Sequence, residues 1–231
     1  MDEIVLIDKP KGITSFDVIR RVRKQIGIKK IGHAGTLDPL ATGLMILGVG
    51  AGTKQLTNLI KLDKEYIAEV LIGERRTTGD MEGEVVESVE AVMLDPAQVL
   101  VAVASLVGTV TLPVSAYSAI KKDGVPMYKR ARAAEKTGNT VTDVPVRDMV
   151  VHSARVDNIE VIFSDATLTA ISRLLVTVTF AVGSGTYIRS LAEELGKRAG
   201  YPATLANLRR TKVGDFKIED ARLIEELKLE Q

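Results

Sequence analysis

The fold of this chain is constrained most by two long runs of β-branched and apolar residues, 150–163 and 168–182. Such runs are typical of strands, and the polar residues between them, near Ser164 and Asp165, predict the turn of an antiparallel pair. Amphipathic segments predict helices at 15–26, 96–106 and 188–200, and a last helix around 223–227. Helices and strands in this order predict a mixed α+β fold, in which a mainly antiparallel sheet is flanked by helices.

Local signals mark the ends of two of these helices. Thr14 or Ser15 can cap the first helix, and Gly27 can end it. Asp95 followed by Pro96 is a cap with proline at the first helical position. Strands are expected at 3–7 and 64–73, since both segments are rich in β-branched and aromatic residues.

The composition indicates a globular protein. The 231 residues are 45% hydrophobic, which is enough for a core, and we expect one domain spanning residues 1–231. No apolar stretch is long enough to span a membrane and no signal peptide is recognisable, so we expect no membrane partner and a cytoplasmic location. The absence of cysteine and the presence of only two histidines predict no metal site. A monomer is expected.

The charge pattern leaves two interpretations open. A net charge of +1 does not indicate a nucleic-acid-binding protein. Basic residues nevertheless occur in short clusters, among them 20–24, 29–30, 121–122 and 209–210. If the clusters share one face they can follow RNA phosphates, whereas each cluster alone is typical of a solvated surface.

Residues 32–48, with the sequence GHAGTLDPLATGLMILG, form a glycine-rich turn that leads into an apolar segment. Pro39 disfavours the helical region for Asp38, and Gly35 permits close approach of another molecule to the backbone. The turn therefore presents a single carboxylate. In isolation, an aspartate that caps nearby amides is the more ordinary interpretation. The stretch matches no phosphate-binding loop or dinucleotide motif, so no nucleotide cofactor is expected.

The same stretch resembles, nearly residue for residue, the catalytic motif of the TruB family of tRNA pseudouridine synthases. Other segments resemble family motifs in family order: 9–15, 64–66, 78–83, 117–121, 185–190 and 208–211. Two departures are visible. Residues 113–116 read Pro-Val-Ser-Ala where members usually have paired prolines, and no C-terminal PUA domain is expected after Phe216.

The resemblance implies a pseudouridine synthase-like catalytic domain with a thumb-like loop at about 124–146. It implies isomerisation of the T-arm uridine, position 55 of tRNA, by cleavage of the C1′–N1 bond, rotation of the base and joining of C1′ to C5. Asp38 matches the catalytic aspartate, which acts either as a nucleophile on C1′ or as a base that removes the 2′ proton. No cofactor is required, because the reaction has no net redox change.

Further site residues follow from the resemblance. Arg189 matches the arginine that pairs with the catalytic aspartate, and Tyr66 matches the aromatic residue that stacks on the target base. His33 resembles the residue that fills the space left by the flipped uridine. Each has a structural alternative: a surface arginine, a core tyrosine and a histidine that caps its own turn. The remaining substrate-binding candidates are Tyr187, Lys9, Gly35, Asp80, Lys121, Arg132 and Arg209.

Two functions of different classes remain at this point. The first is a cofactor-free isomerase that acts on the T-arm stem-loop of tRNA. The second is a tRNA-folding chaperone or RNA-binding module in which catalysis is secondary or lost. A substitution of Asp38 distinguishes them, since it removes chemistry without removing RNA binding.

Overall fold

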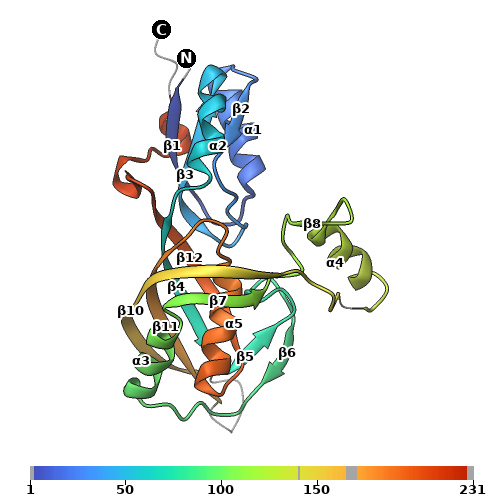
Figure 1. The fold of residues 1–231 in the computed structure, drawn as a ribbon, viewed down its shortest axis with the longest axis vertical. Coiled ribbons are helices and arrows are strands. Elements are labelled where there is room, and N and C mark those ends of the chain that lie inside the picture. Colours follow the sequence, from blue (N-terminus) through green and yellow to red (C-terminus); the bar gives the residue numbers. More distant parts are fainter. Residues whose placement is uncertain (1–2, 140, 165–170, 228–231) are drawn as a thin grey trace. The chain divides into compact units, whose positions relative to one another are not determined.

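The computed structural model describes residues 3–139, 141–164 and 171–227. A nine-stranded sheet has the strand order β1-β3-β12-β4-β11-β10-β7, with β13 beside β12 and β2 beside β3 (Figure 1). Its strands are β1 (Ile4–Lys9), β2 (Ile31–His33), β3 (Thr42–Val49), β4 (Lys64–Ile72), β7 (Gly108–Pro113), β10 (Val146–Ser164), β11 (Ile171–Val182), β12 (Ala203–Val213) and β13 (Phe216–Lys217). Two hairpins stand apart: β5 (Glu74–Arg76) with β6 (Val85–Ser88), and β8 (Lys121–Lys122) with β9 (Val125–Pro126).

The helices are α1 (Ser15–Ile26), α2 (Leu56–Leu59), α3 (Pro96–Ser105), α4 (Met127–Glu135) and α5 (Ile188–Ala199), with 3-10 turns η1 (Gly50–Gln55), η2 (Ile218–Asp220) and η3 (Ile224–Glu226). The pairs β1–β3, β2–β3, β7–β10 and β12–β13 are antiparallel, and β3–β12 is parallel. The predicted α+β class is confirmed.

None of the helices in the described ranges is long and apolar enough to cross a membrane.

The chain divides into two compact units. The first contains Met1–Ala68, Thr179–Gly185 and Asn207–Gln231, and the second contains Glu69–Val178 and Thr186–Ala206.

The first unit is built on β1, β3 and α1. Strand β1 pairs with β3 from Ile4↔Gly48 to Lys9↔Gly43. Helix α1 begins at the Thr14 cap and ends at Gly27, as the sequence predicts. Gly27 has the left-handed backbone conformation that is common where a helix ends. Its buried residues, Val18, Ile19, Val22 and Ile26, pack in one cluster with residues of β1 and β3. The sheet and α1 together support the β2–β3 loop.

The second unit contains the β7–β10 pair and helices α3 and α5. Asp95 caps α3 and Pro96 occupies its first turn, as predicted. Gly196 on α5 lies so close to Ala203 that an added Cβ would overlap its side chain, which explains glycine inside this helix. Helix α4 with β8 and β9 projects beyond the ends of β7 and β10 (Figure 1). Strand β9 and helix α4 lie within the thumb-like loop that the sequence predicts at about 124–146.

The last predicted helix is wrong within the described residues. Only the single 3-10 turn η3 forms at Ile224–Glu226. The side-chain amide of Gln25, on α1, donates to the backbone carbonyls of Glu225 and Leu227. In a longer helix these carbonyls would accept hydrogen bonds from backbone amides of the helix itself. The two long predicted strands are confirmed as β10 and β11, although β10 starts earlier, at Val146. The turn expected at 164–165 lies partly outside the described residues.

Candidate active site

Asp38 lies half-buried in the loop between β2 and β3. Its carbonyl accepts a hydrogen bond from the Ala41 amide at 3.1 Å, which closes a tight turn around Pro39. Ser15 is the first residue of α1, and its hydroxyl forms two hydrogen bonds with the backbone of Leu37. It accepts from the Leu37 amide at 2.8 Å and donates to the Leu37 carbonyl at 2.9 Å. Helix α1 therefore fixes the residue that precedes Asp38.

Lys9 supports the other side of this turn. Its side chain is fully buried, and its ammonium donates to the carbonyls of Ala41 at 2.6 Å, Pro10 at 3.1 Å and Pro39 at 3.4 Å. A direct phosphate contact requires an exposed ammonium, which the structure does not provide for Lys9. The family resemblance made Lys9 a substrate-binding candidate, whereas in the structure its ammonium lies against the carbonyls of the loop at 38–41.

Arg209 and Arg210 are neighbours in β12, and successive side chains of a strand point to opposite faces. Arg209 is partly exposed and forms a two-point contact with the carboxylate of Asp8, at 2.7 and 3.1 Å. Arg210 is only 1% exposed and donates to the carbonyls of Leu44 at 2.7 Å and Gly35 at 3.2 Å. Sequence reasoning treated Arg210 only as part of a basic cluster, although strand alternation was a signal that separated it from Arg209.

His33 and Lys64 lie near Arg210. Burial, and then the positive charge of Arg210, lower the pKa of His33, while a backbone hydrogen bond with Gly35 opposes them. The buried Nδ1 of His33 has no hydrogen-bond partner among the described residues, so the part that His33 plays in the turn stays a prediction. Burial and Arg210 also lower the pKa of Lys64 to about 8. Tyr66 follows Lys64 on the same buried face of β4, so it is positioned by the sheet.

Arg189 is almost fully buried in the first turn of α5. Its guanidinium donates to the Ser115 hydroxyl at 2.9 Å and to the carbonyls of Thr78 at 3.0 Å and Tyr117 at 3.2 Å. The alternative of a helix-surface arginine is therefore wrong. The segment that lacks the paired prolines supplies one of these acceptors, Ser115, which sequence reasoning did not include in the site.

Asp80 is an acidic neighbour of Arg189, and its carboxylate lies 3.6 Å from the guanidinium. The Thr78 hydroxyl and the Glu82 amide donate to the same carboxylate. Because Asp80 is only 2% exposed, the structure assigns it to the surroundings of Arg189 and does not give it the exposure of an RNA contact.

The other candidates of the second unit differ in exposure. Tyr187 is half-buried at the cap position of α5, and its amide lies 3.5 Å from the Met149 sulfur. Lys121 on β8 and Arg132 on α4 are exposed, and the Arg132 guanidinium lies 5.8 Å from the centre of the Tyr128 ring. Both cations belong to the projecting part of the unit and are open to solvent.

The predicted site residues are distributed over both units. His33, Gly35, Asp38, Lys9, Tyr66 and Arg209 belong to the first, and Asp80, Lys121, Arg132, Tyr187 and Arg189 belong to the second. The pairing of Asp38 with Arg189 stays a prediction.

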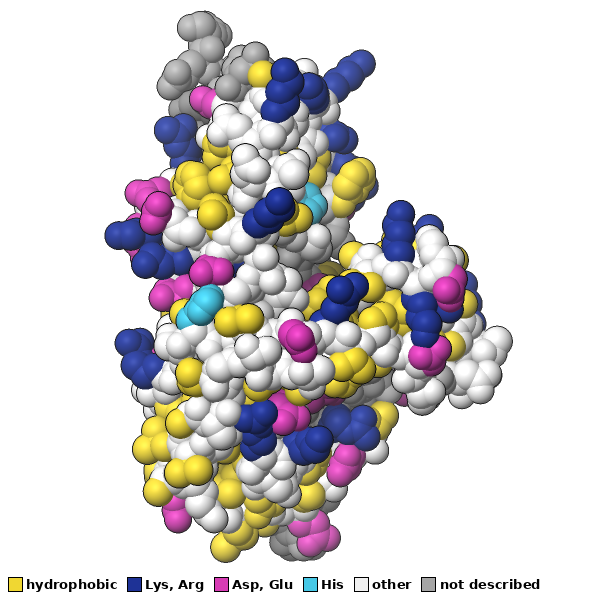
Figure 2. Space-filling view, viewed as in Figure 1, with side chains coloured by type: hydrophobic (Ala, Val, Ile, Leu, Met, Phe, Trp, Pro, Cys, Tyr) yellow, Lys and Arg dark blue, Asp and Glu magenta, His cyan; other side chains and the backbone are white. Residues whose placement is uncertain are grey.

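Basic side chains also gather on the outer face of α1 and on the segment after it. Dark-blue side chains mark this region in Figure 2. The exposed cations here are Arg20, Arg21, Lys24, Lys29 and Lys30. Two of the predicted basic clusters, 20–24 and 29–30, therefore present exposed cations within the first unit.

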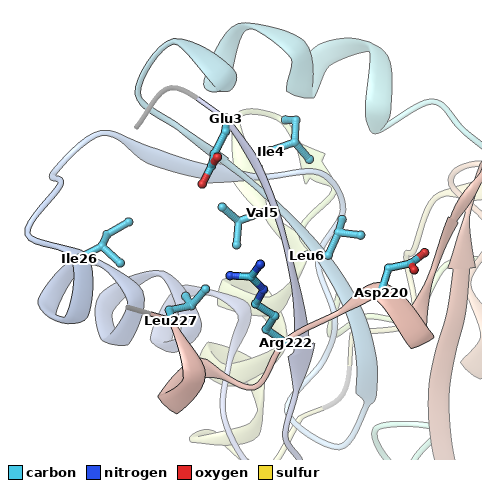
Figure 3. Close-up of a pocket in the computed structure, with 8 residues that line it drawn as sticks. All are labelled: Glu3, Ile4, Val5, Leu6, Ile26, Asp220, Arg222 and Leu227. Carbon is cyan, nitrogen blue, oxygen red and sulfur yellow. The ribbon is translucent and has the colours of Figure 1, made fainter. Parts of the chain in front are cut away.

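A separate pocket of about 200 Å³ lies between β1 and the segment 220–227 (Figure 3). The guanidinium of Arg222 and the carboxylate of Glu3 point into it, and Ile26 and Leu227 form an apolar wall. None of the predicted site residues lines this pocket.

The residues of the 32–48 loop lie in a region that is similar to a known protein family. A family model described as TruB family pseudouridylate synthase (N terminal domain) matches residues 23–188. The chain belongs to the TruB family. It is accordingly a pseudouridine synthase, an isomerase, and the loop with Asp38 lies inside the matched region.

Relatives support this membership of the TruB family. The chain is 40% identical to the tRNA pseudouridine synthase B of Paenarthrobacter aurescens, over 97% of this chain and 68% of that protein. It is 41% identical to the tRNA pseudouridine synthase B of Corynebacterium efficiens, over 94% of this chain and 69% of that protein. A solved H/ACA RNP bound to a substrate RNA containing 2′-deoxyuridine has a chain of the same fold, with a TM-score of 0.66 and 22% identity, over 97% of this chain and 51% of that chain.

Proposed function

We propose that this TruB-family enzyme converts the T-arm uridine of tRNA, position 55, to pseudouridine, with Asp38 as the catalytic group. The observation that carries the proposal is the way Asp38 is held. The turn around it receives hydrogen bonds from Ser15, Lys9 and Arg210, which belong to α1, β1 and β12. A carboxylate on so well supported a turn is pre-oriented for reaction at one sugar carbon.

The reaction requires only a carboxylate that reacts at the sugar. In one route the Asp38 carboxylate attacks C1′ as the C1′–N1 bond breaks, and the released base rotates. C5 then displaces Asp38 from C1′, C5 loses its proton, and N1 takes one up. In the other route Asp38 removes the 2′ proton as the C1′–N1 bond breaks, which leaves a glycal. After the base rotates, C5 bonds to C1′, the proton returns to C2′, and the C5 proton is lost while N1 takes one up. Both routes need an ionised carboxylate at the start, which is the form that a nearby guanidinium favours.

We assign that guanidinium to Arg189. Its acceptors Thr78, Ser115 and Tyr117 hold it in one orientation, and Asp80 balances part of its charge. Fixed donors of this kind stabilise negative charge without reorganisation during the reaction.

The uridine must leave its stack to reach Asp38, at a cost of a few kcal/mol. We assign Tyr66 to stacking on the flipped base and His33 to the space that the base leaves. A lowered pKa keeps His33 neutral near pH 7, which favours contact with bases over contact with phosphates. Lys121, Arg132 and the basic surface of α1 are the proposed phosphate contacts. The tRNA substrate implies a cytoplasmic reaction.

The test is conversion of uridine to pseudouridine in a tRNA transcript, with the modified position mapped by chemical labelling. Wild type is compared with Asp38→Asn, and tRNA binding is measured for both. We expect conversion at position 55 by wild type, and loss of conversion with retained binding in the variant. Binding without conversion by wild type would contradict the proposal and favour a chaperone.

A further inference from the structure

Arg210 is a buried arginine that has no carboxylate partner within the described part of the chain. Among the described residues no Asp or Glu oxygen lies within ion-pair distance of its guanidinium, which is 1% exposed. Removing a guanidinium from water is costly, and such a group is retained only where its hydrogen bonds are well made. The acceptors of Arg210 are two backbone carbonyls, those of Leu44 and Gly35.

These two carbonyls lie on either side of Asp38. Gly35 follows β2 and Leu44 lies near the start of β3, so one planar group bridges the two arms of the loop. The fork is rigid, since both nitrogens belong to a single delocalised plane. Its bonds fix the distance between the arms.

The sheet sets the position of the fork. Arg210 is the register partner of Gly43 in the parallel β3–β12 pair. An added Cβ at Gly43 would overlap the backbone oxygen of Arg210, so the two strands approach more closely here than another residue would permit. The side chain of Arg210 therefore starts from a fixed backbone point beside the loop.

We infer that Arg210 is a positioning residue for the reaction, whose guanidinium ties Gly35 to Leu44 and thereby sets the direction in which the loop presents Asp38. The inference rests on the proposed function of Asp38. Arg210 acts on the loop and needs no contact with the RNA.

The charge of Arg210 gives a second signature. Three groups that can carry positive charge, His33, Lys64 and Arg210, surround Gly35, and the charge of Arg210 lowers the pKa of the other two. Asp63 is the acidic group that acts on Lys64 in the opposite sense. Loss of the Arg210 charge should therefore raise the pKa of His33.

Two variants separate geometry from charge. Arg210→Lys keeps the charge but loses the fork, and Arg210→Gln loses the charge but keeps an amide that can donate. The matched control is Arg173→Lys, because Arg173 is also buried and donates to backbone carbonyls, those of Val89 and Ser172, in the second unit.

Single-turnover pseudouridine formation and tRNA affinity are measured for each protein. We expect the rate of Arg210→Lys to fall on the order of 10- to 100-fold, the effect of a small misplacement of a reacting group, with affinity within about threefold of wild type. Arg173→Lys should lose stability but keep its rate. A rate for Arg210→Lys within about threefold of wild type, or an equal loss in Arg173→Lys, would overturn the inference.

Two further measurements do not depend on activity. Hydrogen exchange at the amides of Leu37 and Ala41 should accelerate in both Arg210 variants and stay unchanged in Arg173→Lys. The NMR titration of His33 should move to higher pH in Arg210→Gln but not in Arg210→Lys. If wild type fails to form pseudouridine, the proposed function is wrong, while unchanged exchange at Leu37 and Ala41 would still refute the role of Arg210 in the loop.

Discussion

The carboxylate of Asp80 lies 3.6 Å from the guanidinium of Arg189, and both side chains are almost completely buried. A buried arginine whose donors are divided among Thr78, Ser115 and Tyr117 has little rotational freedom. Asp80 supplies the negative charge that makes the burial of Arg189 tolerable. The pair therefore links the loop 78–83 to the first turn of α5.

Replacing Asp80 with asparagine should slow the reaction more than it weakens RNA binding. The amide retains the volume and can still accept from Thr78, but the charge that opposes Arg189 is lost. We expect a fall in single-turnover rate of about tenfold or more, equivalent to at least about 1.4 kcal/mol, with tRNA affinity nearly unchanged. Asp95→Asn is the control, since asparagine caps α3 as well as aspartate does. Equal rates for Asp80→Asn and wild type would refute the coupling.

A methyl group at Gly43 should destabilise the first unit. Gly43 has φ of +101°, and its added Cβ would meet the backbone of Arg210, which cannot move without breaking the β3–β12 pair. We expect Gly43→Ala to lower the free energy of unfolding by at least about 2 kcal/mol in chemical denaturation. Gly124→Ala isolates the backbone cost, because Gly124 also has positive φ but has open space around it. Similar losses in the two variants would show that the close approach to Arg210 contributes nothing.

His33 should make the folded state sensitive to acid. Its folded pKa is below the ordinary value of 6.5, so the unfolded chain takes up a proton more readily. Stability therefore falls as pH decreases through about 6.5 toward the lower folded pKa, by about 1.4 kcal/mol for each unit of separation. Unfolding measured between pH 7.5 and pH 5.5 should show a smaller loss in His33→Asn. An identical pH dependence for variant and wild type would exclude this contribution.

The basic surface of α1 should determine part of the salt dependence of tRNA binding. Each phosphate contact contributes about 0.7 to 0.9 to the slope of log affinity against log salt concentration. Substituting Arg20, Arg21 and Lys24 with glutamine should reduce that slope by about 2 to 3 if the three side chains bind phosphates. Arg155→Gln provides a single exposed arginine of the second unit for comparison. A triple variant with the wild-type slope would assign the α1 charges to a solvated face.

Local chemistry was sufficient for much of the fold. The Thr14 cap, the Gly27 stop and the Asp95-Pro96 start are interactions within one helical turn, so they can be recognised from neighbouring residues. The long β-branched runs likewise predicted β10 and β11. The prediction of a last helix was wrong because Gln25, about 200 positions away in sequence, donates hydrogen bonds to the backbone carbonyls of that segment.

The environments of the charged residues were decided by tertiary structure. Motif spacing pointed to Asp38 and Arg189, since the resemblance is carried by short contiguous segments. The burial of Lys9 and Arg210, the contact between Asp80 and Arg189, and the acceptor Ser115 each depend on segments that meet only after folding. A lysine or arginine in a sequence is equally compatible with a solvated surface and with a buried fork on backbone carbonyls. Only the packing of the chain around it removes water and determines which role it has.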